Sequence, residues 1–445
     1  MQAIVIPTIG PVADSLRVSR LAGTWVLTAY LLSGAVTTPL VGRLGDLFGN
    51  RRVLIWVLWI TAAGGVLSAC STAFALVVLG RILAGTCTAT MPLGYGIMRE
   101  HLPNARLGPM VALVAVSIAV GTGIGNVLAG TVQHGLGTQW LFGLPLLLTL
   151  PTCVMAQLWV PNSLGRERGR VNWSSAIAMA VSLLSLLIAV SESTTWGWQS
   201  PRTLGLLAFG AVALVGWVLV ELAAEQPLID MRLMALPGVW RTNVTSLLFG
   251  FGMFAAFTVV PQFAETPRSS GYGFGASVTI ASLILVTATV TATVGGPLSG
   301  RLERSYGAKV PLVVGGLIGL CGYLLICLLN THIAALFVAF ALLGVGMGVG
   351  YAVLPHVIVL AVPREHTGGA TGINVIARNI GGAIGIQLGA TVLAAHLAPG
   401  TALPSRSGYL VTFWLLAAAG AGATIGSLTI PTRRRLSAAA STAVS

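Results

Sequence analysis

Apolar runs long enough to cross a lipid bilayer follow one another along almost the whole chain. A membrane-spanning helix needs about 20 mostly apolar residues, and thirteen segments come close to or exceed that length. They lie near 25–41, 53–71, 74–95, 109–132, 140–160, 173–193, 203–222, 241–262, 275–298, 310–329, 332–358, 373–397 and 408–430. Because irregular backbone is not tolerated against lipid, we predict an all-α polytopic membrane protein.

The residues before these runs suggest one more helix that is incomplete. As a helix, Met1 to Ala13 would reach only about 20 Å, and Pro7 and Pro11 interrupt it. No basic segment opens the chain, so these residues do not resemble a signal peptide. We expect about fourteen spans, the first one short, and a misassigned start codon is the simplest explanation.

The net charge of +13 raises the possibility of a nucleic-acid partner, but membrane topology explains it better. Of the 24 Lys and Arg, 17 fall in alternate loops that begin with 42–52 and end with the tail at 433–435, and five fall in the opposite loops. The positive-inside rule therefore places the 42–52 loop and the C-terminus in the cytosol. This favours a multi-pass protein of the plasma membrane.

A charged segment at Gly42–Arg52 returns in degraded form at Gly300–Lys309, 258 residues later. A repeat of this kind indicates the two related halves of a transporter. The interval holds eight predicted spans, so two helices, 173–193 and 203–222, are added to a six-plus-six plan. The predicted domains are 1–160 (first six-helix half), 161–240 (inserted pair and linkers), 241–430 (second six-helix half) and 431–445 (cytosolic tail).

The first charged segment carries a recognisable motif. Gly42, Asp46, Gly49, Arg51 and Arg52 fit the pattern G-x-x-x-D-x-x-G-x-[RK]-[RK]. With this motif the chain resembles the major facilitator superfamily, and within it the fourteen-span drug:proton antiporter branch. The resemblance implies secondary active transport by alternating access, with efflux of amphipathic drug-like or natural-product compounds coupled to proton influx.

The residue types of this motif suit a gate between the two halves. Glycine lets two helix ends come close, and Asp46 can accept hydrogen bonds from a helix N-terminus or an arginine. The resemblance implies that the segment stabilises one access state. The alternative is an ordinary cytosolic turn whose charges only set topology. In the degraded copy Arg304 stands where Asp46 stands in the first.

Charges inside the predicted spans are candidates for proton coupling. Arg81 lies about 10 Å from the outer end of its helix, where a charge is costly unless it faces the bundle or water. Arg81–Gly85 resembles the R-x-x-q-G motif, in which the arginine is implicated in coupling. Arg378 lies nearer the cytosol, where reaching the interface is favoured. Both arginines are candidates for proton coupling or for a buried charge.

None of the eleven carboxylates lies mid-span. Eight of them, including Glu221 and Glu303, are expected in the cytosol. The groups left for proton coupling are Asp14, Glu192 and Glu265 near the outer ends, His356 near the inner end, or an acid upstream of Met1. An outer carboxylate such as Asp14 is the partner that we propose for Arg81.

Two further sets of residues are assigned provisional roles. Gly121, Gly125, Asn126 and Gly130 resemble the antiporter signature, with Asn126 in place of its proline, and predict close helix packing. A substrate cavity is predicted from Thr88, Met91 and Tyr95 on one helix facing Asn243, Phe251, Phe254 and Phe257 on another. The alternative is that these aromatic residues meet lipid or other helices.

Several classes of function find no support in the sequence. There is no phosphate-binding loop, no metal-ligand spacing and no hydrolase motif, so we predict no enzyme, cofactor, metal, nucleotide or nucleic acid. The expected partners are the lipid bilayer, a small amphipathic substrate and protons. A weakly coupled or facilitated metabolite carrier, a non-transporting scaffold and a decayed transporter remain as alternatives.

Overall fold

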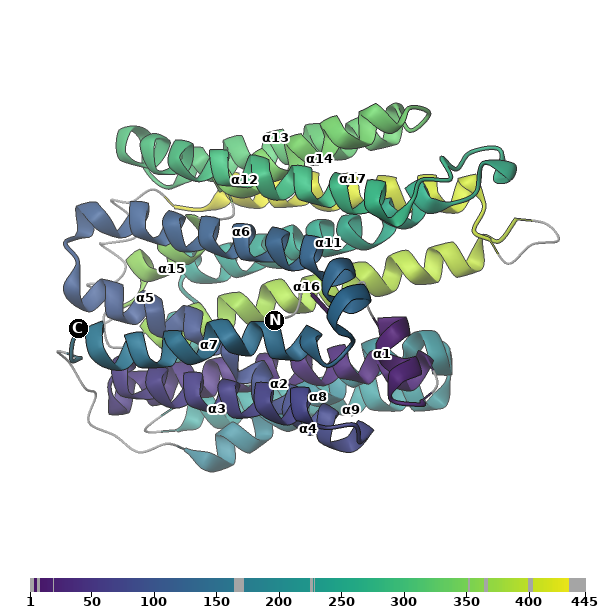
Figure 1. Ribbon diagram of the computed structural model, residues 1–445. Coiled ribbons are helices and arrows are strands. Elements are labelled where there is room, and N and C mark those ends of the chain that lie inside the picture. The colour runs from purple at the N-terminus through teal and green to yellow at the C-terminus, as the bar shows by residue number, and fades with distance from the viewer. Residues whose placement is uncertain are drawn as a thin grey trace.

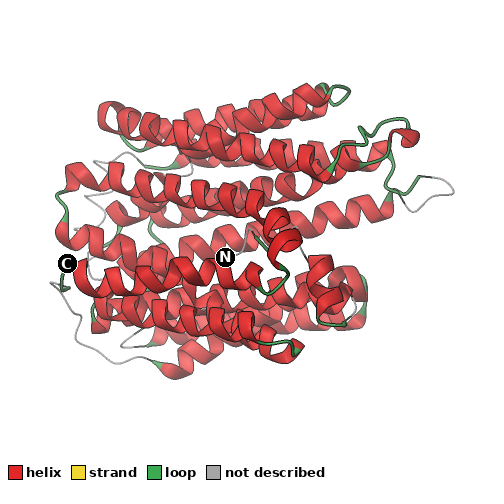
Figure 2. Cartoon of the chain, viewed as in Figure 1, coloured by secondary structure: helices red, strands yellow, loops and turns green. Residues whose placement is uncertain are grey.

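The computed structural model describes residues 4–5, 9–18, 20–163, 172–224, 227, 229–350, 353–363, 367–398 and 403–431. Within these ranges the chain is built of helices, most of them long and roughly parallel (Figures 1 and 2). The predicted all-α class is confirmed for this part of the chain.

The helices follow the predicted apolar runs closely, because a long apolar segment satisfies its backbone hydrogen bonds internally only as a helix. The first six long helices are α2 (Arg20–Phe48), α3 (Asn50–Cys70), α4 (Phe74–Gly85), α5 (Thr90–His101), α6 (Asn104–Leu136) and α7 (Trp140–Trp159). The next are α8 (Trp173–Trp196), α9 (Pro201–Ala223) and the short α10 (Met231–Met234). The rest are α11 (Pro237–Glu265), α12 (Val278–Tyr306), α13 (Lys309–Leu328), α14 (Ile333–Gly350), α15 (Leu354–Ala361), α16 (Thr367–Ala395) and α17 (Arg406–Thr429).

The predicted total of fourteen spans is not confirmed. Among the described residues, twelve helices are long and apolar enough to cross a membrane, counting α4 with α5 and α14 with α15 as single helices. The 33-residue α6 is longer than any of them, but several of its side chains lie outside the described part. The short first helix, α1 (Ile9–Ser15), has seven residues and as a helix extends only about 10 Å.

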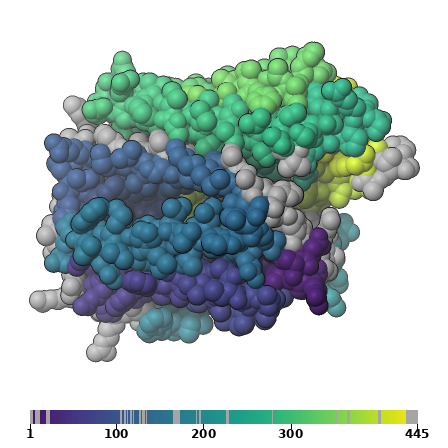
Figure 3. All heavy atoms as spheres, viewed as in Figure 1, coloured from purple at the N-terminus to yellow at the C-terminus, as the bar shows by residue number. Residues whose placement is uncertain are grey.

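The N-terminal helices and the C-terminal helices form two groups that meet along a seam. In Figures 1 and 3 the N-terminal helices, purple to blue, and the C-terminal helices, green to yellow, lie in separate groups. The contacts across the seam are made chiefly by α2 against α16 and by α6 against α12. The proposed domain boundaries stay predictions, and the gate predicted from the sequence is expected at this seam.

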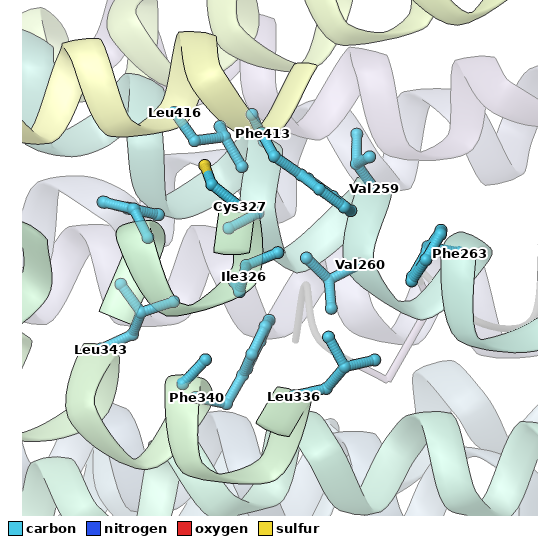
Figure 4. Packing of buried hydrophobic residues seen from close by; sticks show 14 of the residues in the cluster. Val259, Val260, Phe263, Ile326, Cys327, Leu336, Phe340, Leu343, Phe413 and Leu416 are labelled. Carbon is cyan, nitrogen blue, oxygen red and sulfur yellow. The ribbon is translucent and has the colours of Figure 1, made fainter. Parts of the chain in front are cut away.

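Inside the C-terminal group, six helices share one hydrophobic core. Side chains from α11, α12, α13, α14, α16 and α17 interdigitate there, and Figure 4 labels ten of them. Phe263 of α11 packs edge-on against Phe413 of α17, with ring centroids 5.3 Å apart. Such a core makes these helices one packed unit.

A single glycine, and not a long loop, separates the two helices of the charged segment. We expected a turn over 42–52, but α2 continues to Phe48, only Gly49 breaks the helix, and α3 starts at the next residue. Gly49 has φ 94° and Gly307, between α12 and α13, has φ 81°. These two glycines are 258 residues apart, so the repeat found in the sequence has the same backbone break in both copies.

Candidate functional site

Asp46 lies where the two groups of helices touch. Its carboxylate is buried, with 8% of the residue exposed, and its Oδ2 accepts a hydrogen bond of 3.4 Å from the backbone N–H of Gly369. Gly369 is in the first turn of α16, where unpaired N–H groups and the helix dipole favour an anion. The side chain therefore links α2 of the first group to the N-terminus of α16 in the second.

The helix backbones come close beside this contact because both carry glycine. A Cβ built on Gly42 of α2 would lie 2.7 Å from the carbonyl oxygen of Gly368 in α16. A Cβ on Gly368 would in turn lie 2.8 Å from the Gly42 carbonyl oxygen and 2.9 Å from Asp46 Oδ1. Any side chain at either position forces the helices apart, whereas a Cβ on Gly369 meets no atom within 4 Å.

This difference supplies a matched pair of variants. We expect Gly368→Ala to open the contact between α2 and α16 and to slow transport several-fold, because the added methyl group overlaps the backbone of α2. Gly369→Ala keeps the N–H that Asp46 accepts from and is expected to transport like the parent. Transport by the two variants at equal amounts in the membrane is the measurement. Equal rates would show that the close approach has no part in the transport cycle.

A second contact joins the groups near Asp46. Arg99, close to the end of α5, donates to the carbonyl oxygens of Val362 at 2.8 Å and Pro363 at 3.3 Å, and also to the hydroxyl of Thr367. Thr367 is the first residue of α16. Arg99 had no assigned role in the sequence, since an arginine near a helix end is expected to reach water. Its hydrogen bonds show that α5, as well as α2, holds the N-terminus of α16 against the first group of helices.

The arginines of the motif have different environments. Arg51 donates from Nη1 to the side-chain oxygen of Asn162 at 2.6 Å and from Nη2 to the carbonyl oxygen of Gln157 at 2.7 Å. Both acceptors belong to the end of α7 and the residues after it. Arg51 thus fixes α3 to α7 within the first group, whereas Arg52 is exposed as expected for a residue that anchors the turn in the cytosol.

Arg81 is the most deeply placed charge in the first group. The residue is 3% exposed, and its Nε donates to the carbonyl oxygen of Val26 in α2 at 3.0 Å. Its guanidinium carbon lies 4.4 Å from the ring centre of Tyr30 in α2 and 5.8 Å from that of Phe142 in α7. Among the described residues, Nη2 has no hydrogen-bond partner. The guanidinium is held mainly by aromatic faces, which attract a cation.

The other two predicted coupling residues are not brought to Arg81. Asp14 lies on α1 and is exposed, and no ion pair joins it to Arg81 within the described ranges. Arg378 was expected to extend to the membrane surface. The residue is instead 6% exposed, which agrees with the other interpretation of Arg378, a buried charge, and its part in proton coupling stays a prediction. The residue lies on α16, whose backbone at this position comes so close to Gly250 of α11 that a Cβ there would meet the Arg378 carbonyl oxygen.

An acid–base pair is present that the sequence did not predict. His356 of α15 bonds through Nδ1 to the carboxylate of Glu303 in α12, and the side chains are 7% and 11% exposed. Glu303 belongs to the degraded second copy of the motif and was expected to be a cytosolic charge. The sequence contained no signal for this pairing, since the two residues are 53 positions apart.

The glycines of α6 are only partly described. Gly121 is exposed, and a Cβ on it would meet nothing within 4 Å, so this position does not support tight packing. Gly125 is half-buried, and the surroundings of Asn126 and Gly130 lie outside the described residues. The close approach of α6 to α12 is instead at Gly123, where a Cβ would lie 2.6 Å from Thr289.

The residues of the predicted cavity on the 3-10 turn Thr86–Ala89 and on α5 face neighbouring helices. The hydroxyl of Thr88 lies 2.9 Å from that of Thr38 in α2. Tyr95 is 2% exposed and packs with Val359 of α15, and Met91 lies against the same cluster. This part of the predicted set therefore contributes to packing between helices, including packing across the seam.

The residues of the set on α11 face other helices of the C-terminal group. Asn243 accepts a hydrogen bond of 3.0 Å from Asn374 of α16. Phe254 lies against Gly382 of α16, and Phe257 stacks on Phe340 of α14 with ring centroids 5.6 Å apart. Phe251 packs against the core of the C-terminal group. None of these contacts joins the α11 residues to Thr88, Met91 or Tyr95.

Comparison with known families identifies the architecture. A sequence model described as Major Facilitator Superfamily matches residues 1–386 and, in a second match, residues 242–444. The chain belongs to the Major Facilitator Superfamily. Together with the helices long enough to cross a membrane, this makes it a multi-pass membrane transporter and not an enzyme.

Two solved transporter structures have the same fold as this chain. The human organic anion transporter MFSD10 superposes with a TM-score of 0.67 over 95% of this chain and 88% of that one, at 15% identity. The proton:xylose symporter XylE superposes with a TM-score of 0.66 over 98% of this chain and 94% of that one, also at 15% identity. At this identity the likeness concerns the fold alone.

Relatives within the superfamily include named drug transporters. The chain is 27% identical to the multidrug transporter protein MdtP of Bacillus subtilis, over 87% of this chain and 70% of that one. It is 26% identical to the tetracenomycin C resistance and export protein of Streptomyces glaucescens, over 84% and 69% of the two chains. A match to an uncharacterized MFS-type transporter of Mycobacterium tuberculosis, at 28% identity, spans 52% of that relative's length.

Proposed function

We propose that this protein exports amphipathic drug-like or natural-product compounds from the cell across the plasma membrane, in exchange for protons. The contact between Asp46 of α2 and the N-terminus of α16 carries the alternating-access part of this proposal, because it ties a helix of the first group to a helix of the second. The relatives from Bacillus and Streptomyces are named a multidrug transporter and a tetracenomycin C resistance and export protein, and these names favour export of a drug-like compound.

The test is transport by the purified chain in proteoliposomes with an imposed pH gradient. Three amphipathic aromatic probes of similar size, one neutral, one anionic and one cationic, separate the substrate classes. We expect movement of at least one probe that stops when a protonophore collapses the gradient. Empty liposomes and liposomes with the Gly368→Ala variant are the controls. Probe movement equal to that of empty liposomes would contradict the proposal.

A weakly coupled or facilitated carrier is the second candidate, and one observation favours it. Asp14, the carboxylate proposed to share a proton pathway with Arg81, is exposed and makes no ion pair with it. Uptake or efflux that depends on the concentration gradient of the compound, and not on the pH gradient, would support this candidate.

The proposed orientation places the Asp46 contact and the C-terminus in the cytosol. Single cysteines at Gln199, between α8 and α9, and at Tyr306, at the end of α12, test this in a cysteine-free background, because both positions are exposed. We expect an impermeant maleimide to label the Gln199→Cys protein in intact cells and the Tyr306→Cys protein only after the cells are broken. The reverse pattern would invert the topology.

A further inference from the structure

The inserted helix pair contains a buried carboxylate at the end of α9. Glu221 is 2% exposed, although it stands in the last turn of its helix. One oxygen accepts a hydrogen bond from Ser175 and one of 3.1 Å from the indole N–H of Trp217, and the backbone N–H of Ile229 lies 3.5 Å from the other oxygen. The helix dipole disfavours an anion at a C-terminus, so a carboxylate kept here needs a further partner.

We assign this role to Arg43 of α2, which is 6% exposed. Trp217, the donor to Glu221, packs in one cluster with Leu40 of α2, and Leu40 and Arg43 are three positions apart, on the same face of the helix. The charges of Asp46 and Glu221 both attract the guanidinium of Arg43. Arg43 and Asp46 are three positions apart on one helix, the spacing at which side chains meet. A continuous series of charges therefore runs from Glu221 of α9 through Arg43 and Asp46 of α2 to the N-terminus of α16.

The inserted pair also lies along the seam between the two groups of helices. Leu187 of α8 packs with Leu32 of α2 and is in the same cluster as Ile380 of α16. Nearer the other end of α8, Met179 belongs to a cluster that includes Ile376 of α16. Because α8 packs against both α2 and α16, separation of these two helices also changes the packing of α8.

We propose that the inserted pair is part of the gate and that Glu221 is a positioning residue within it. Glu221 and Asp46 both attract Arg43. Because Glu221 partly neutralises Arg43, the carboxylate of Asp46 interacts more strongly with the N-terminus of α16. When Glu221 is neutral, Arg43 is balanced by Asp46 alone, and the attraction between Asp46 and α16 weakens. The inserted helices thereby set the balance between the two access states. This inference rests on the proposed alternating-access function.

A cysteine buried across the seam reports this balance without any substrate. Val359 of α15 is 2% exposed and packs against Tyr95 of α5, so a Val359→Cys protein in a cysteine-free background reacts with a maleimide only when the groups separate there. In the full chain in proteoliposomes, we expect Glu221→Gln to raise the labelling rate roughly twofold to fivefold, the range for a charge beside a helix N-terminus.

Two comparisons separate the charge of Glu221 from its packing. Trp217→Phe removes a hydrogen-bond donor to Glu221 and keeps the carboxylate, so a smaller increase is expected. Combined with Asp46→Asn, Glu221→Gln is expected to add almost nothing, because both changes act on the same interaction. An equal increase in Trp217→Phe would show a packing effect, and additive increases would show independent action. Either result would overturn the inference.

The same assay distinguishes this inference from the gate itself. If Asp46→Asn leaves the labelling of Val359→Cys unchanged, the proposed gate fails. If Asp46→Asn raises it and Glu221→Gln does not, the gate stands and only the role of the inserted pair is refuted.

Discussion

Replacement of Asp46 by Asn is expected to impair transport strongly while the protein still inserts and folds. Asn preserves the shape of the side chain but removes the negative charge that faces the N-terminus of α16. A partly buried charge in such a position contributes up to about 2 kcal/mol, which corresponds to roughly a thirtyfold shift between the two access states. We therefore expect efflux to fall about tenfold or more, measured in vesicles that contain equal amounts of parent and variant.

The control for this prediction is a variant that keeps the negative charge and lengthens the side chain. Asp46→Glu retains a carboxylate, so partial activity is expected, well above that of the Asn variant. Thermal unfolding of the purified proteins checks that the loss does not come from misfolding. Equal efflux by parent and Asp46→Asn would reduce Asp46 to a residue that only helps to set topology.

The contact made by Asp46 was predictable in part because its motif is local. Gly42, Asp46 and Gly49 fall within eight residues of one another, and their types require close approach, an acceptor and a helix break. The sequence also showed that Asp46 suits a helix N-terminus. It could not show that this terminus belongs to α16, which begins at Thr367, because no pattern in one sequence relates such distant positions.

The candidate cavity was less predictable than the fold, for a physical reason. The 3.6-residue period of a helix tells which residues share a face, but all faces of these helices are apolar, so the period does not tell which face meets which neighbour. Phe254 and Phe257 are three positions apart, yet one lies against α16 and the other against α14. The sequence predicts Glu221 as a cytosolic charge, whereas the residue is 2% exposed, and the reason is similar: its burial depends on neighbouring helices that the sequence does not place.

Replacement of Arg81 by Met is expected to abolish efflux driven by a pH gradient without loss of stability. A buried ion whose hydrogen bonds are incompletely satisfied costs free energy, and an apolar side chain of similar length often stabilises such a site. Arg81 keeps one hydrogen bond and two aromatic contacts, while its Nη2 has no partner in the part of the chain that the structure describes. We therefore expect an unchanged or higher unfolding temperature for Arg81→Met.

The reason to expect loss of function is the depth of the charge. A cation inside a membrane protein is maintained against a cost, and the usual reason is a role in moving ions or substrate. Arg81→Lys keeps the charge and loses the planar fork that lies over Tyr30, so it should retain part of the pH-driven efflux that Arg81→Met lacks. Exchange of labelled for unlabelled substrate, with no pH gradient, should persist in both variants. If efflux by the Arg81→Met variant follows the pH gradient as efflux by the parent does, proton coupling depends on other residues. The buried pair of Glu303 and His356 is then the next pair whose charges should be removed by substitution.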